Sequence, residues 1–170
     1  YGAVSFLKTE NGINSVLNSA YSSMFITSSG FIMRDRIFTL NEFPGDIFWS
    51  WGGGFESIAT VFMTFNWDSQ HRYLRNRFRF YYPGIRDANS LLDNIDEVNT
   101  ISDEKKLQFK SEAIFIRAVC YYYLWEYFGP VPLITTTEDL DFEPLRPSEE
   151  EFNNFIEDEL QSAAAGLPIV

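Results

Sequence analysis

The chain has 170 residues, a net charge of −11 and one cysteine, Cys120. This length is sufficient for one domain with a core of its own. The net negative charge argues against nucleic-acid binding, because no overall positive field attracts phosphate, and a lone cysteine excludes a disulfide within the chain.

The first predicted helix covers residues 9–26, where apolar side chains recur at the spacing of one helix face. These residues are Ile13, Val16, Leu17, Ala20, Tyr21 and Met24. We expect Thr9 or Asn11 to cap the start of this helix and residues 28–30 to end it. We interpret it as an amphipathic core helix.

Residues 30–68 show no sustained helical period and contain Pro44-Gly45 and the glycines at 52–54. A short helix is expected to begin near Phe55. A loop of this length in a compact domain is usually functional or disordered. Its many aromatic residues disfavour disorder, so the pattern favours a functional loop.

Residues 69–97 are predicted to be helical again, although Pro83 lies in their middle. Proline removes a backbone donor and disfavours helix at the residue before it. Either the helix kinks at Pro83, or Pro83 is a first-turn residue of a new helix. The apolar face continues beyond it through Leu91, Leu92, Ile95 and Val98.

Residues 102–128 are predicted to form one long helix, capped by Ser102 and stopped by Gly129-Pro130. One apolar face consists of Phe109, Ala113, Ile116, Cys120, Tyr123 and Tyr127, and the second of Phe115, Ala118, Tyr122 and Trp125. A helix with two apolar faces needs neighbours on both sides. Cys120 on the first face is therefore interpreted as a small buried residue.

The last predicted helix begins at Ser148, which is expected to form a capping box with Glu151. An acidic loop, residues 135–146, precedes it. The connection 98–102 is short, so the helices on either side of it are expected to pack antiparallel. The predicted fold is all-α, with TPR-like antiparallel helical hairpins and a long aromatic-rich loop, although the strict TPR consensus is absent.

Three segments between Tyr82 and Pro168 resemble signatures of the SusD/RagB family, the surface glycan-binding lipoproteins of Bacteroidetes. The first contains Tyr82, Ile85, Ala88 and Asn89; the second is EAIFIRAVCYYYLWEYFGPVPL at 112–133; the third is Arg146-Pro147-Ser148 followed by Phe152, Ile156, Asp158, Leu160, Ala163 and Leu167-Pro168. They occur in the family's order and cover half of the chain, whereas residues 1–81 match only loosely. Family helices run continuously where this chain has Pro83-Gly84.

The resemblance implies a non-enzymatic protein of the outer membrane that binds an oligosaccharide or similar nutrient at the cell surface. It also implies a partner, a SusC-type TonB-dependent transporter over which the protein closes as a lid. Because family members are several times longer and lipid-anchored, we expect residues 1–170 to be a single N-terminal SusD-like region of a larger protein. We expect attachment to the membrane only through a lipid anchor upstream of Tyr1, and no cofactor, metal or nucleic-acid partner.

Two rival functions remain open, a helical-repeat scaffold that binds protein or peptide partners and a glycan-active hydrolase. Glycoside hydrolysis needs two carboxyl groups across one cleft, and no pair stands out in the sequence. A Ser-His-Asp triad would have to use His71, the one histidine, and zinc and nucleotide motifs are absent. No catalytic residue is therefore assigned.

The candidate ligand-binding residues lie mainly in the aromatic-rich loop. A flat indole ring can stack on the apolar face of a sugar ring, while nearby amide, carboxylate and guanidinium groups bind its hydroxyls. The candidates are Trp49, Trp51, Trp67, Asn66, Asp46, Asn41 and Arg72. The alternative is that the tryptophans fold inward as a small core under the loop.

Charged residues leave two further questions open. The arginines at positions 72, 75, 77, 79 and 86 form a basic cluster with no acid between Ser69 and Arg86. They either pair with acids such as Asp35, Asp46 or those of residues 138–143, or meet an anionic ligand or partner. Arg117, on an otherwise apolar helix, is expected to have a structural role as a bridge to a neighbouring helix.

Overall fold

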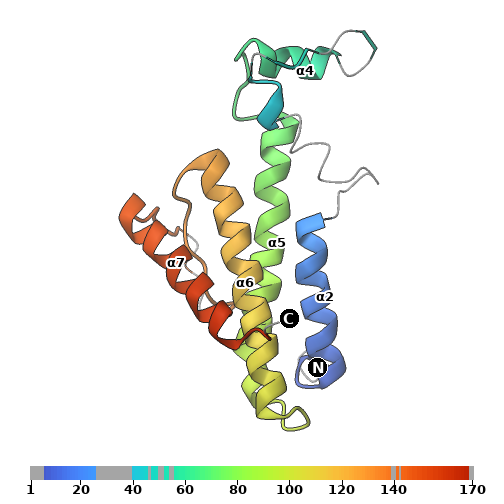
Figure 1. Ribbon diagram of the computed structural model, residues 1–170, viewed down its shortest axis with the longest axis vertical. Helices are drawn as coiled ribbons and strands as arrows, with labels where there is room; N and C mark the ends of the chain where they lie inside the picture. Colours follow the sequence, from blue (N-terminus) through green and yellow to red (C-terminus); the bar gives the residue numbers. More distant parts are fainter. Residues whose placement is uncertain are drawn as a thin grey trace. The chain divides into compact units, whose positions relative to one another are not determined.

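The computed structural model describes residues 6–25, 40–45, 47–49, 52–53, 56–138, 141 and 143–168. It contains the helices α2 (Glu10–Phe25), α4 (Glu56–Met63), α5 (Arg72–Asn94), α6 (Asp103–Phe128) and α7 (Glu149–Gly166), with a 3-10 turn, η1 (Ile95–Glu97), after α5 (Figure 1). No strand occurs in the described ranges, and the predicted all-α class is confirmed. None of the helices described here is both long and apolar enough to span a membrane.

The chain divides into two compact units. The helical unit comprises Tyr1–Met24 and Phe80–Val170, and so contains α2, α6, α7 and most of α5. The loop unit comprises Phe25–Arg79, and so contains α4 and the first two turns of α5.

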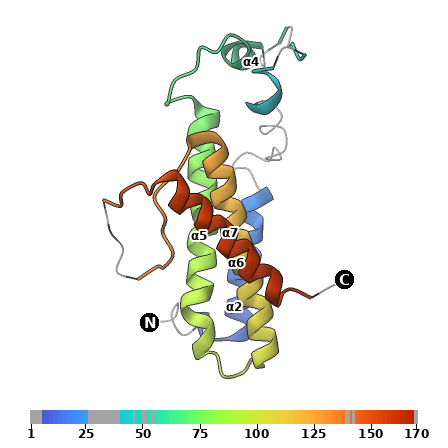
Figure 2. The ribbon, with the colours of Figure 1, turned by 60° about the vertical axis from the view of Figure 1, so that its left-hand side comes forward.

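In the helical unit, α5 and α6 run antiparallel and are joined by the short connection that follows η1 (Figures 1 and 2). α7 packs against α6. α2 contacts both long helices, because Ser19 donates a hydrogen bond to Asp87 of α5 (2.5 Å) and Tyr21 donates one to Glu112 of α6 (2.9 Å). The antiparallel hairpin predicted for α5 and α6 is confirmed.

Three predicted helix caps are confirmed. The side chain of Thr9 accepts the backbone N–H of Gly12 (3.1 Å), and that of Ser102 accepts the N–H of Lys105 (3.3 Å). At the start of α7, Ser148 accepts the N–H of Glu151 (3.2 Å) while the Glu151 carboxylate accepts the N–H of Ser148 (2.8 Å), which completes the capping box. These bonds lower the pKa of the Glu151 carboxyl, because they favour its charged form.

α5 continues through Pro83, so the prediction that Pro83 could start a new helix is wrong. The packing around the neighbouring residue Gly84 explains why α5 tolerates the Pro83-Gly84 pair. A Cβ atom on Gly84 would lie 3.0 Å from the Cβ of Ser23 and 3.1 Å from the Sγ of Cys120. The missing side chain therefore lets α5 approach α2 and α6 closely, and tertiary packing outweighs poor helix propensity.

The first predicted apolar face of α6 is buried along most of its length, and Cys120 is fully buried within it. Burial raises the pKa of the Cys120 thiol to about 12. The second predicted face is wrong in detail, because Phe115 and Tyr122 are 36% and 46% exposed. The second buried face is instead centred on Arg117, Tyr121 and Leu124, one step around the helix. Hydrophobic spacing did not identify this face, because two of its three central residues, Arg117 and Tyr121, carry polar groups.

Arg117 holds the helical unit together as predicted. Its Nε and Nη2 atoms bind both carboxylate oxygens of Glu159 in α7 (2.6 and 2.8 Å). Its Nη1 atom donates to the side-chain oxygen of Asn89 in α5 (2.7 Å) and to the carbonyl of Thr135 (3.1 Å). Asn89 in turn donates to the carbonyl of Ile134 (2.8 Å). One guanidinium thus joins three helices and the segment after α6, and its charge is matched by Glu159.

Candidate functional site

The connection between α4 and α5 in the loop unit is built around Phe62. The Phe62 side chain is 1% exposed. Its ring lies 4.6 Å from the ring of His71, 5.7 Å from Trp67 and 6.3 Å from Tyr73. Burial, with the nearby Arg72 charge, lowers the pKa of His71. These ring contacts fix the residues that follow α4 against the start of α5.

α4 ends in a Schellman motif, in which the N–H of Asn66 binds the carbonyl of Val61 (2.9 Å) and the N–H of Phe65 binds that of Phe62 (3.2 Å). This motif places its penultimate residue in the left-handed region, where glycine is favoured. Phe65 occupies that position, with φ of 54°. Its ring is 67% exposed and lies 5.5 Å from the ring of Trp67. A strained backbone therefore presents an aromatic ring to solvent, which suggests a functional role.

A shallow, open hollow of about 390 Å³ lies along one side of α4. It is lined by Gly53, Glu56, Ser57, Thr60, Val61, Thr64 and Asn66. The hydroxyls of Thr60 and Thr64 donate to backbone carbonyls of α4 (2.8 and 2.7 Å) and keep lone pairs for acceptance. The side chains of Ser57 and Asn66 make no hydrogen bond within the described residues. The hollow therefore offers hydroxyl and amide groups that suit a neutral polyol.

Glu56 supplies the carboxylate of this hollow. One of its oxygens accepts the backbone N–H of Gly52 (2.9 Å). Gly52 and Gly53 both adopt positive φ, 80° and 73°. Their conformational freedom is required here, because only glycine adopts this backbone without strain. Gly53 therefore lines the hollow beside Glu56.

The structure brings some of the predicted ligand-binding residues together. Asn66 lines the hollow, and Trp67, 39% exposed, follows it directly. Arg72 is exposed, with its guanidinium carbon 5.1 Å from the centre of the Tyr73 ring. Phe65, which hydrophobic spacing did not single out, joins this group. Its signal in the sequence was an aromatic residue at a helix end with no glycine to stop the helix.

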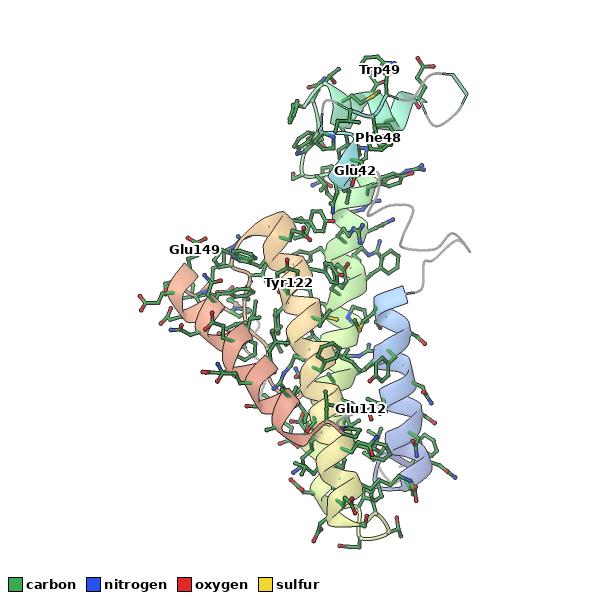
Figure 3. All side chains as sticks on the ribbon, viewed as in Figure 1. Glu42, Phe48, Trp49, Glu112, Tyr122 and Glu149 are labelled. Atoms are coloured by element: carbon green, nitrogen blue, oxygen red, sulfur yellow. The ribbon has the colours of Figure 1, made fainter. Side chains whose placement is uncertain are left out.

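The other predicted residues are not among the described residues that line the hollow. Trp49 is 67% exposed beside the 42% exposed Phe48, and both lie near α4 in Figure 3. Trp49 is thus not an inward-packed core residue. Asn41 is exposed. Asp46 and Trp51 lie outside the described residues, so their role in ligand binding stays a prediction.

A second hollow, of about 510 Å³, lies in the helical unit between α5 and residues 134–137. Its main polar groups already bind within the protein. Asn89 binds Ile134 and Arg117, and Tyr82 donates to the carbonyl of Pro132 (3.2 Å). Thr136 and Thr137 both donate to Asp93. The hollow on α4 is therefore the better candidate for a polar ligand. Among the residues that the structure describes, no three potential metal ligands cluster together.

Comparisons with known proteins agree with this architecture. The family model described as "Starch-binding associating with outer membrane", of the SusD-like proteins, matches residues 5–169. The SusD-like protein P25 of Formosa agariphila is 33% identical over 91 residues, which cover 54% of this chain and 16% of that protein.

Two solved structures share the fold. A laminarin-binding SusD-like protein superposes with a TM-score of 0.79 at 27% identity, covering 94% of this chain and 34% of its own. Surface glycan-binding protein A from Bacteroides thetaiotaomicron, in complex with laminarihexaose, gives a TM-score of 0.76 at 15% identity, covering 93% and 32%. The chain thus spans about a third or less of the length of these relatives. With its family model matched over nearly the whole sequence, it belongs to the SusD-like family.

Proposed function

We propose that this chain is part of a cell-surface glycan-binding protein of the outer membrane, and that the α4 site contacts the glycan. The site is defined as the hollow on α4 together with Phe65, Trp67 and Arg72. The observation that carries the proposal is the juxtaposition of a hydroxyl- and amide-lined hollow with exposed aromatic rings. Rings stack on sugar faces and the polar groups bind hydroxyls. The laminarin and laminarihexaose named for the two solved relatives support a glycan as ligand.

Binding accounts for the site better than hydrolysis does. Among the described residues that line the hollow, Glu56 is the one carboxylate, and it is held by the backbone of Gly52. Glycoside hydrolysis uses two carboxyl groups on either side of the scissile bond. We therefore propose a non-catalytic role. We also propose that the remaining predicted candidates contact the glycan further along its length: Trp49, Trp51, Asp46 and Asn41.

The family relationship also supports a partner and a location for the full-length protein. We propose that it is lipid-anchored in the outer membrane and closes as a lid over a SusC-type TonB-dependent transporter. Affinity purification from native membranes in gentle detergent is expected to recover a large β-barrel in near-equal amount. Recovery of the protein alone would count heavily against the lid. Recovery of soluble peptide-binding complexes instead would favour a helical-repeat scaffold.

Substitution of Trp67 tests the glycan site directly. In the full-length protein, calorimetric titration with the glycan that a glycan array identifies is expected to show at least tenfold weaker binding for Trp67→Ala, or about 1.4 kcal/mol. Asn66→Ala is expected to weaken binding to a lesser degree. Tyr122→Ala removes a ring of similar exposure, 46%, from α6 in the helical unit and serves as the matched control (Figure 3). Equal binding by the parent and both α4-site variants would show that the site lies elsewhere.

A further inference from the structure

The start of α5 carries three exposed arginines on one side of the helix. Arg72, Arg75 and Arg79 are separated by three and four residues, which places them on one face. We call them the arginine face. No acidic residue lies in the first turn of α5. Like charges at this spacing repel one another, and positive charge at a helix N-terminus opposes the helix dipole. The arrangement therefore lowers the stability of the free protein, and a ligand-binding role would explain it.

Within the described residues of the loop unit, no acidic side chain neutralises the arginine face. The chain has 24 acidic and 13 basic residues, yet none of these three arginines forms an ion pair with a described acid of the loop unit, Glu42, Glu56 or Asp68. Cations elsewhere do form pairs: Lys8 with Glu97, Arg86 with Asp87, Lys105 with Glu10, Lys110 with Asp96, and Arg117 with Glu159. The acids of residues 138–143 belong to the other unit, and Asp35 and Asp46 lie outside the described residues, so the predicted pairing of these three arginines with those acids stays a prediction.

The arginine face lies next to the proposed glycan site, within the same unit. The Arg72 guanidinium lies 5.1 Å from the Tyr73 ring, and the Tyr73 ring lies 6.3 Å from that of Phe62. Phe62 in turn contacts Trp67 at 5.7 Å. Contact with an aromatic ring holds the guanidinium in place without consuming its charge or its N–H donors. A glycan stacked on Trp67 can therefore extend toward fixed positive charge.

We propose that the arginine face binds anionic substituents, carboxylate or sulfate, on the glycan, so that the ligand is an acidic polysaccharide. This inference rests on the proposed glycan-binding function and names its substrate class. The planar guanidinium group matches the paired oxygens of both substituents and binds them in bidentate fashion. A polyanion is repelled by a chain of net charge −11, so a local positive face favours its binding at this position.

The dimensions of the face favour a glycan over an acidic protein partner. From Arg72 to Arg79 the helix rises about 10 Å. A patch of about 800 Å², the area that each partner contributes to a stable protein interface, is roughly 30 Å across and so about three times as long. A short row of charges beside stacking rings suits successive substituents along one polysaccharide chain.

Matched pairs of glycans test the proposal in the full-length protein. One pair is oligogalacturonate before and after methyl esterification of its carboxyl groups, and the other is carrageenan oligosaccharides before and after desulfation, so that carboxylate and sulfate are tested separately. The quantity measured by calorimetry is the ratio of the affinities for the charged and neutral members. The parent is expected to prefer at least one charged member by tenfold or more, with a preference that falls as salt rises.

The combined variant Arg72→Gln, Arg75→Gln, Arg79→Gln is expected to reduce that ratio to near one. The matched control, Lys8→Gln, Lys105→Gln, Lys106→Gln, removes the same number of charges from the helical unit and is expected to keep the ratio. Arg75→Gln alone, at an exposed position, provides a milder variant if the triple variant unfolds, and is expected to lower the ratio severalfold.

Three outcomes would overturn the inference. If the parent binds neutral glycans and prefers neither charged member, the inference is wrong and the proposed function still holds. Equal loss of preference in the lysine control would mean that only net charge matters. Loss of a co-purified acidic protein in the arginine variant, without a change in glycan preference, would assign the face to a protein partner. No binding of any glycan on the array would instead overturn the proposed function itself.

Discussion

The two units of this chain treat their polar groups in opposite ways. In the helical unit, the buried polar side chains of Asn89, Arg117 and Tyr121 all find partners inside the protein, across α5, α6, α7 and the segment after α6. On the surface of the loop unit, Ser57 and Asn66 keep side-chain hydrogen-bonding capacity, and Phe65 and Trp67 keep exposed rings.

This difference separates stability from recognition. Buried groups that are satisfied internally specify one packing and have nothing left for a ligand. Unsatisfied polar groups and rings at a surface are bound to water and can exchange it for a ligand. We therefore expect substitutions in the helical unit to change stability strongly, and substitutions in the α4 site to change binding with small effects on stability.

Arg117→Met is expected to have the largest effect on stability. It leaves the Glu159 carboxylate, with a side chain 14% exposed, without its cation, and removing one partner of a buried pair costs roughly 3–5 kcal/mol. Urea unfolding measures the loss. The double variant Arg117→Met with Glu159→Met removes both charges and is expected to recover part of it. A single variant as stable as the parent would mean that the bridge is unimportant.

Gly84→Ala is expected to destabilise the protein by about 1–3 kcal/mol, because its new Cβ would lie only 3.0 Å from the Cβ of Ser23 and 3.1 Å from the Sγ of Cys120, so that both neighbours must shift. On helix propensity alone the same change would stabilise α5 by about 1 kcal/mol, so the sign of the effect decides between packing and propensity. Thermal unfolding gives that sign. Adding Cys120→Ala, which removes the Sγ atom from the contact, is expected to relieve part of the loss.

Phe65→Gly is expected to separate stability from glycan binding within the loop unit. Glycine relieves the left-handed backbone strain at this position, so stability should hold or rise by up to about 1 kcal/mol. Loss of the exposed ring should weaken glycan binding several-fold. Thermal unfolding and calorimetric titration of the same preparation test both results. Lower stability with unchanged glycan binding would mean that Phe65 has a structural role and does not contact the glycan.

Tyr21→Phe is expected to have the smallest effect, visible mainly at high pH. Burial and the bond to Glu112 raise the pKa of Tyr21 to about 12 from 10. The unfolded protein therefore loses this proton first, and the stability that Tyr21 contributes is complete below pH 10 and is lost as pH rises toward 12. The stability difference between parent and variant should shrink over that range, as measured by urea unfolding at several pH values. A constant difference would contradict the raised pKa.

Local sequence signals predicted most of the helical unit. Ser102, Ser148 with Glu151, and Thr9 cap helices because their side chains bond to amides within one turn. Gly129, with φ of 66°, ends α6 for an equally local reason. The bridging role of Arg117 was predicted as well, since a charge among apolar residues needs a partner, but Glu159 and Asn89 could not be named as the partners because they lie on other helices.

The sequence by itself determined the helices, their antiparallel order and the aromatic character of the loop, because periodicity, capping and chain connectivity act over a few residues. Only the tertiary structure decided that α5 continues through Pro83, that the second buried face of α6 is centred on Arg117, Tyr121 and Leu124, and that Asn66 meets a hollow on α4 beside the ring of Phe65. Each of these depends on atoms brought together from distant positions or on a backbone angle set by a whole motif. Packing at Gly84 and the Schellman turn at Phe65 outweigh local preferences, and residue spacing alone does not report either one.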